Sequence, residues 1–242
     1  MPFSTEIREN RAFAAEIKFY VPSDRVDALR DWARGRLSPD PYGSGPFGDT
    51  YLTNSLYFDT SEFDVFRRRG SFGRSKYRIR RYGDAPELFF ERKLKTRDHV
   101  TKRRSIVDVQ DLTRVAASDP QKGWPGHWFH RRILARELGV VCQVAYNRTA
   151  LVQTNGYGPI RMTLDRNLRS VAGNDLAFRD LSDQPSLIGD NGILELKFYR
   201  AVPPVFNEMM DRFELTVSPI SKYRIAIKHL NLAPAKAQEA TI

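Results

Sequence analysis

The 242-residue chain carries 39 Lys and Arg residues against 29 Asp and Glu residues, which gives a formal net charge of +10 and an isoelectric point near 9.8. This surplus of positive charge indicates an anionic partner, which could be phosphate, nucleic acid or a membrane surface. The single cysteine, Cys142, excludes an intramolecular disulfide, and no Cys/His spacing typical of zinc sites occurs. Because no apolar run approaches roughly 18 residues and the N-terminus lacks the pattern of a signal peptide, we expect a cytoplasmic protein with no membrane span of its own.

Eight segments show the alternation of apolar and polar residues that is typical of β-strands. In chain order they are 13–20, 51–59, 75–82, 88–95, 101–109, 140–153, 159–164 and 192–199. Apolar residues at helical spacing predict helices at 22–35, 62–69, 111–117, 127–138 and 205–215, and a last helix that begins near residue 221. Gly139 stands where a helix commonly ends. We expect residues 1–232 to form one domain and the Ala-rich residues 233–242 to form a disordered tail.

The strand predicted at 75–82 carries Lys76, Arg78 and Arg80 at alternate positions, so their side chains stand in a row on one face. Neighbours in this row are roughly 7 Å apart, and each such pair of like charges costs about 2 to 3 kcal/mol at an effective dielectric constant of about 20. An anion bound along the row would relieve this repulsion. Arg81 is one residue out of phase and is predicted to point to the opposite face. Taken alone, the row could equally be the solvated face of an edge strand.

Further predicted strands repeat this arrangement of one apolar and one charged face. The charged faces carry Glu16 and Lys18; Glu91, Lys93 and Lys95; Lys102 and Arg104; Tyr146 and Arg148; Arg161, Thr163 and Asp165; and Glu195 and Lys197. A sheet of eight strands usually closes, and its interior then holds side chains or one slim ligand. We therefore predict an α+β fold, a closed eight-stranded antiparallel β-barrel with helices packed outside. Its charged interior would be unstable when empty, and a polyanion inside it would resolve the repulsion.

Nine short motifs occur in one order between residues 16 and 223. They are EIKFY (16–20), SLYFDT (55–60), KYRIRRYG (76–83), ERK (91–93), KRR (102–104), YNR (146–148), RMTLD (161–165), LELK (194–197) and SKY (221–223). Each motif alone is weakly specific, but nine in order are specific. In them the chain resembles the VTC domain, the polyphosphate polymerase domain of the vacuolar transporter chaperone complex, which belongs to the triphosphate tunnel metalloenzyme superfamily.

The resemblance implies an eight-stranded tunnel, a divalent metal cofactor (Mn²⁺ or Mg²⁺), and transfer of the terminal phosphate of ATP onto a growing polyphosphate chain. It also implies roles for individual residues. The phosphate-binding set would be Lys18, Arg78, Arg80, Lys93, Lys102, Arg148, Arg161, Lys197, Ser221 and Lys222, and Arg78, Arg80 and Lys222 would act in catalysis. Glu195 would be a metal ligand and Glu16 a second one, since a hard divalent ion prefers oxygen ligands.

The chain departs from the wider superfamily at one position, because Ala14 stands where the first Glu of the Glu-x-Glu-x-Lys motif would be. This substitution weakens the interpretation as a two-metal hydrolase. The sequence also contains neither the SPX domain nor the membrane helices of the eukaryotic complexes. Coupling of synthesis to translocation would therefore need a separate membrane protein partner, which would hold the domain at the inner face of a membrane.

Other functions stay open from the sequence alone. A triphosphatase would use the same tunnel to transfer a terminal phosphate of triphosphate, polyphosphate or a nucleoside triphosphate to water. A non-catalytic module would only hold polyphosphate or an inositol phosphate. Nucleic acid is a weaker candidate because the aromatic residues look buried rather than arranged for stacking. Any single cation could also form a structural ion pair, for example Lys93 or Lys102 with Glu91, and no catalytic role is assigned to the four histidines.

Overall fold

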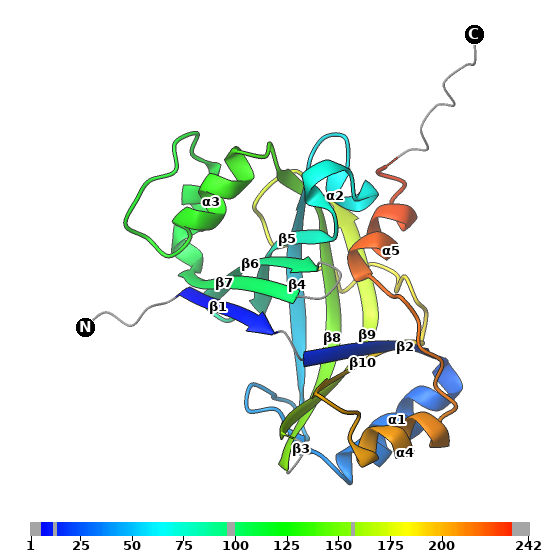
Figure 1. Ribbon diagram of the computed structural model, residues 1–242. Helices are drawn as coiled ribbons and strands as arrows, with labels where there is room; N and C mark the ends of the chain where they lie inside the picture. Colours follow the sequence, from blue (N-terminus) through cyan, green and yellow to red (C-terminus); the bar gives the residue numbers. More distant parts are fainter. Residues whose placement is uncertain (1–5, 12–13, 96–99, 156–157, 234–242) are drawn as a thin grey trace.

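The computed structural model describes residues 6–11, 14–95, 100–155 and 158–233, and an antiparallel sheet runs through them (Figure 1). Its strands lie side by side in the order β1-β7-β6-β5-β4-β8-β9-β10-β2, and β3 pairs with β8. The strands are β1 (Glu6–Arg11), β2 (Ala14–Val21), β3 (Ser38–Pro39), β4 (Thr50–Asp59), β5 (Ser75–Tyr82), β6 (Glu87–Lys95), β7 (Val100–Asp108), β8 (Gly139–Asn155), β9 (Gly158–Ala172) and β10 (Gly192–Tyr199).

The sheet is rolled into a barrel. β1 and β2 lie at opposite ends of the strand order but are consecutive in the chain, so the two edges of the sheet come back together. The ammonium of Lys93 on β6 lies 2.9 Å from the carboxylate of Glu16 on β2, although β5, β4, β8, β9 and β10 separate these strands in the sheet. No backbone ladder joins β1 to β2 within the described ranges, so side chains rather than hydrogen-bonded strands complete the tunnel-like barrel.

Helices pack on the outside of this barrel (Figure 1), which confirms the predicted α+β architecture. The α-helices are α1 (Ser23–Arg34), α2 (Asp64–Arg67), α3 (His127–Leu134), α4 (Pro204–Arg212) and α5 (Lys222–His229), and the 3-10 helices are η1 (Gly70–Phe72) and η2 (Val109–Ala116). None of the helices in the part of the chain described here is long and apolar enough to cross a membrane.

Two apolar clusters lie between the barrel and its helices. In one, Phe58 of β4 and Phe90 of β6 pack against Phe129 of α3, with ring centroids 5.4 and 5.2 Å apart. In the other, Leu196 of β10 is fully buried in a cluster that also contains Phe206 of α4. Since successive residues of a strand point to opposite faces, this outward packing of apolar side chains directs the alternate, charged residues into the barrel.

The structure differs from several predicted boundaries. β1 and β3 lie outside the predicted strands, and β9 continues to Ala172 instead of ending at 164. The helix predicted at 127–138 ends at Leu134, because Glu137 adopts a left-handed conformation (φ 52°) and Leu138 N–H donates to the Ile133 carbonyl at 2.9 Å. Gly139 therefore begins β8 and does not end the helix.

Two further predicted segments are the helix at 111–117 and the tail. The segment predicted as a helix at 111–117 lies in the 3-10 helix η2, which begins two residues earlier and is capped by the Asp108 carboxylate accepting from Gln110 N–H at 2.8 Å. Of the predicted tail, residues 234–242 lie outside the described residues.

Candidate functional site

Charged side chains from the inner faces of the strands, from the segment that follows β3 and from the start of α5 form the candidate site, which we call the bore. Its eleven cationic residues are Lys18, Lys76, Arg78, Arg80, Lys93, Lys102, Arg104, Arg148, Arg161, Lys197 and Lys222. Its five carboxylates are Glu16, Asp40, Glu91, Asp165 and Glu195. Positive charge thus exceeds negative charge in the bore.

Glu91 on β6 is the centre of the first ion cluster, and its side chain is only 2% exposed. Its Oε2 accepts from Arg78 Nε at 2.6 Å, and its Oε1 accepts from Arg104 Nε at 2.7 Å. Lys102 Nζ lies 3.2 Å from the same Oε1. Burial raises the pKa of Glu91, but the surrounding cations outweigh burial and hold this pKa well below its usual range. One carboxylate therefore orients cations from β5 and β7.

Asp165 on β9 is the centre of the second ion cluster. Arg148 on β8 donates to both carboxylate oxygens, at 2.6 and 2.8 Å, in the paired geometry that a planar guanidinium favours. Lys222 Nζ, from the first turn of α5, lies 2.6 Å from Asp165 Oδ2. Burial would raise the pKa of Asp165, but Arg148 and Lys222 lower it to about 2. The carboxylate thus attaches the beginning of α5 to the inner face of the barrel.

The predicted metal ligands, Glu16 and Glu195, converge on one ammonium group. Lys18 Nζ lies 3.0 Å from Glu16 Oε1 and 2.8 Å from Glu195 Oε2. Lys197 on β10 lies 2.7 Å from Glu195 Oε1, and Lys93 contacts the other oxygen of Glu16. Burial and the neighbouring Glu195 would raise the pKa of Glu16, but the three ammonium groups lower it to about 2. Two ionised carboxylates from the adjacent strands β2 and β10 therefore face the same position, which the Lys18 ammonium occupies.

Arg80 and Lys76 form no ion pair with a carboxylate among the residues that the structure describes. Arg80 is 4% exposed and donates to Ser55 Oγ at 3.1 Å and to the Tyr146 hydroxyl at 3.0 Å. Lys76 donates to Ser221 Oγ at 3.0 Å. Burial and the charges of nearby cations lower the pKa of Lys76 to about 7. A buried charge without a counter-ion is costly, so Arg80 marks a position where an anion would be stabilised. Lys76 is half-buried, and the lowering of its pKa by burial and neighbouring cations marks a second such position.

The start of α5 is held rigidly beside the bore. Ser221 caps the helix, and its Oγ accepts from Arg224 N–H at 3.4 Å. The Tyr223 hydroxyl donates to the buried Asp59 carboxylate at the end of β4. Asp59 also accepts from two backbone N–H groups of α2 at 2.8 Å. These contacts fix the positions from which Ser221 and Lys222 face the interior.

The structure brings all of the predicted site residues together in or beside the bore. Arg78 and Arg80 face the interior, whereas Arg81 faces away and donates to the Asp84 and Ala85 carbonyls at 2.8 Å. The sequence prediction omitted Arg104 from the site, although its alternation with Lys102 was a usable signal.

For the tyrosines and the central carboxylates, alternation indicated the inward face of Tyr146, Glu91 and Asp165 but not most of their partners. Tyrosine hydroxyls accept from arginines: Arg148 donates to Tyr146 at 3.3 Å and Arg161 donates to Tyr51 at 2.9 Å. The roles of Glu91 and Asp165 as central counter-ions depend on which strands are neighbours, and local sequence patterns do not contain that information.

Comparison with known proteins shows which family this chain belongs to. The family model described as the VTC domain matches residues 13–231. No curated protein sequence matches the chain. Solved structures with a similar fold include a proposed adenylate cyclase from Bacillus halodurans, with a TM-score of 0.52 and 15% identity, covering 88% of this chain and 95% of that one.

Two other solved structures show the same likeness. A Hippeastrum protein, proposed as an adenylyl cyclase and described as having a dominant triphosphatase activity, has a TM-score of 0.52 and 16% identity over 90% of this chain and 96% of its own. The PH1819 protein of Pyrococcus horikoshii has a TM-score of 0.51 and 11% identity over 90% and 99%. At such identities the structures establish a shared fold. Because the family model spans nearly all of the described chain, this protein belongs to the VTC domain family.

Proposed function

We propose that the bore binds a chain of phosphates and that the protein is a metal-dependent phosphoryl transferase, which moves the terminal phosphate of ATP onto polyphosphate. The observation that carries this proposal is the excess of cations on the inner face of the barrel, eleven against five carboxylates, with Arg80 buried and not ion-paired within the described residues. Membership in the VTC domain family supports it.

The protein's part in such a reaction is to position the phosphates and to stabilise charge, since phosphoryl transfer needs no protein nucleophile. Arg78 and Arg148 are already oriented by Glu91 and Asp165, and a phosphate oxygen could take the place of either carboxylate. Guanidinium groups match the geometry of two phosphate oxygens, whereas the ammonium groups of Lys76 and Lys222 act as point charges. We infer that an entering phosphate chain exchanges these ion pairs for contacts with phosphate.

Glu16 and Glu195 are suited to hold a divalent metal such as Mn²⁺ or Mg²⁺. Their carboxylates are ionised and converge on the Lys18 ammonium, at 3.0 and 2.8 Å. No group of three or more acidic, histidine or cysteine side chains suited to a metal occurs in the described ranges. Two carboxylates suit an ion that takes its remaining ligands from water and phosphate. The metal would supply Lewis-acid stabilisation of the transferring phosphate.

The carboxylates of the bore are not suited to act as a general base toward water. A base that activates water needs a pKa near the working pH. The pKa of Asp165 is about 2 and that of Glu91 is well below its usual range, so both are weak bases. The terminal phosphate of a polyphosphate is already ionised near neutral pH and needs no base. A triphosphatase remains the alternative, because a protein of the same fold is described as having that activity.

The product formed from ATP tests this proposal. With ATP and Mn²⁺, we expect the purified protein to make long-chain polyphosphate, which gel electrophoresis separates from free phosphate. Free phosphate without polymer would identify a triphosphatase instead. Binding of tripolyphosphate with no turnover would identify a non-catalytic module.

Glu195→Gln tests the metal assignment within the same assay. We expect this variant to lose metal-dependent turnover but to keep its affinity for tripolyphosphate measured without metal, because the cations of the bore remain. Glu87→Gln, at the exposed start of β6, is the matched control and should behave like the wild type. Full activity of Glu195→Gln would remove this residue from the site.

Arg80 and Arg81 provide a test of the strand register. Arg80→Ala should lower turnover by about 10²-fold or more, the usual scale for removing a preorganised donor to transition-state charge. Arg81→Ala should change turnover little, because Arg81 contacts only backbone carbonyls of the adjacent turn among the described residues. Steady-state rates, with circular dichroism as the check on folding, make the comparison. Equal losses in the two variants would contradict the inward direction of Arg80.

The lowered pKa of Lys76 predicts that the protein takes up a proton when tripolyphosphate binds. A pKa of about 7 leaves Lys76 mostly neutral at pH 8, and a phosphate chain beside it would raise this pKa toward the ordinary lysine value. Affinity for tripolyphosphate should therefore fall as pH rises above 7. Calorimetry in buffers of different ionisation enthalpy should show more protons taken up by the wild type than by Lys76→Met at pH 8. An identical uptake in Lys76→Met would show that Lys76 does not titrate with the ligand, and Lys228→Met, on the exposed side of α5, serves as the control.

A further inference from the structure

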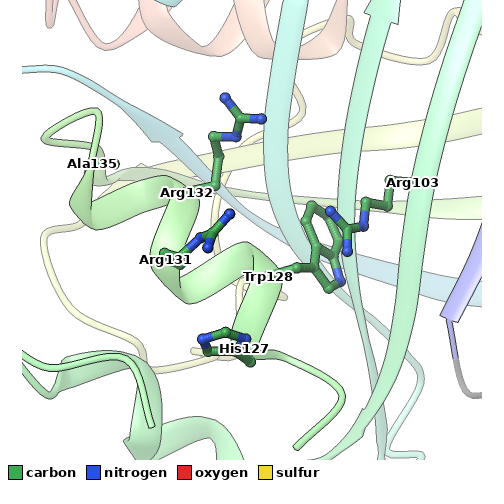
Figure 2. Close-up of a pocket in the computed structure, with 6 residues that line it drawn as sticks. All are labelled: Arg103, His127, Trp128, Arg131, Arg132 and Ala135. Atoms are coloured by element: carbon green, nitrogen blue, oxygen red, sulfur yellow. The ribbon is translucent and has the colours of Figure 1, made fainter. Parts of the chain in front are cut away.

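A second basic site lies on the outer surface of the barrel, beside α3. A pocket of about 390 Å³ opens there, and Figure 2 shows Arg131 and Arg132 projecting from α3 while Arg103 lies beside the ring of Trp128. His127 and Ala135 complete its lining. Arg103 belongs to β7, where Lys102 and Arg104 point into the bore, so strand alternation places Arg103 on the opposite face.

Arginine side chains are concentrated around this pocket. Arg92 on β6 and Arg103 on β7 are directly opposite each other in the antiparallel ladder, an arrangement in which like charges destabilise a sheet. Arg132 lies close enough to them that burial and the charges of Arg92, Arg136 and Arg103 lower its pKa. Five guanidinium groups, including Arg131, are thus gathered on one outer surface.

Four of these guanidinium groups, those other than Arg103, have few contacts within the described residues that offset their charge. Arg92, Arg131, Arg132 and Arg136 make no ion pair with a carboxylate among those residues, and Arg136 donates to the Ser71 hydroxyl at 3.0 Å. The Nε of Arg92 is buried without a hydrogen-bond partner. Arg103 covers the face of the buried Trp128 ring, with its guanidinium carbon 4.3 Å from the ring centroid. The bore, in contrast, contains carboxylates at the centre of its cation clusters.

We infer that this pocket is a second anion site, separate from the bore, that binds a compact ligand with several phosphate groups. Guanidinium groups recognise phosphate through paired hydrogen bonds, and three of them line this one pocket. Trp128 is buried and donates to Ser105 Oγ, so it offers no exposed ring for stacking a nucleobase. The pocket is concave and of limited volume, which suits an oligophosphate better than a flat membrane surface or a nucleic-acid duplex.

Titration calorimetry with tripolyphosphate tests this inference without depending on turnover. We expect the wild type to bind two molecules, one in the bore and one in the pocket. Arg131→Gln/Arg132→Gln should weaken the pocket site by about tenfold or more, because two charged hydrogen-bond donors to phosphate are removed. Arg80→Ala/Lys222→Ala should weaken only the bore site. Inorganic phosphate should bind the pocket at least about tenfold more weakly than tripolyphosphate.

The control variant is Arg212→Gln/Lys228→Gln, which removes the same charge from exposed positions on α4 and α5. A single tripolyphosphate per wild-type chain would overturn the inference, as would a pocket variant no weaker than this control. If the double pocket variant folds poorly, Arg131→Glu at an exposed position replaces it, and unchanged second-site affinity there would also overturn the inference. Failure to form polyphosphate from ATP would contradict the proposed function but leave this binding result unaffected.

Discussion

The bore depends on holding more positive charge inside a barrel than its own carboxylates neutralise. Isolated charges in a low-dielectric interior are costly, and ion pairs there recover the desolvation cost only with good geometry. Glu91 and Asp165 provide that geometry, since each accepts short bonds from an arginine and lies within 3.2 Å of a lysine ammonium. These carboxylates let the protein fold around its cations without a ligand. They also preset the arginine orientations that a phosphate chain would use.

Rigid elements surround these ion clusters. The apolar outer faces of the strands pack beneath α1, α3, α4 and α5, which keeps the charged faces directed inward. The Asp59 carboxylate joins the end of β4 to α2 and, through Tyr223, to α5. Lys222 directly precedes Tyr223 in α5. The hydrogen bond between Tyr223 and Asp59, which lies outside the bore, therefore helps to fix the position of Lys222 within it. Preorganisation of this kind is the main protein contribution to stabilising transferred charge.

Strand alternation made much of this site predictable. The inward direction of Arg80, the outward direction of Arg81 and the shared face of Glu195 and Lys197 follow from a period of two residues. Of the partners across strands, the sequence named Lys102 for Glu91, which the structure confirms at 3.2 Å. It did not name Arg78 or Arg104, which meet Glu91 because β5 and β7 are the neighbours of β6. The roles assigned to these residues in binding, catalysis and metal coordination stay predictions.

Local backbone geometry accounts for other differences from the sequence prediction. α3 ends before Gly139 because Glu137, a residue with no special turn preference, adopts the left-handed conformation. β3 spans only two residues, Ser38–Pro39, and its pairing with β8 comes from the fold and not from an alternating pattern. The arginines on the outer surface were also difficult to interpret, because Arg92 and Arg103 look like ordinary solvated residues until their strands are paired.

A crystal structure with bound tripolyphosphate would test the central claim most directly. The account predicts a phosphate chain inside the barrel, with its oxygens within hydrogen-bond distance of Arg80, Arg78 and Lys76, and with at least one arginine turned from its carboxylate toward phosphate. Tripolyphosphate bound only on the outer surface, with the ion pairs of Glu91 and Asp165 unchanged, would contradict it. That result would mean that the charged interior is a structural ion network and not a phosphate site.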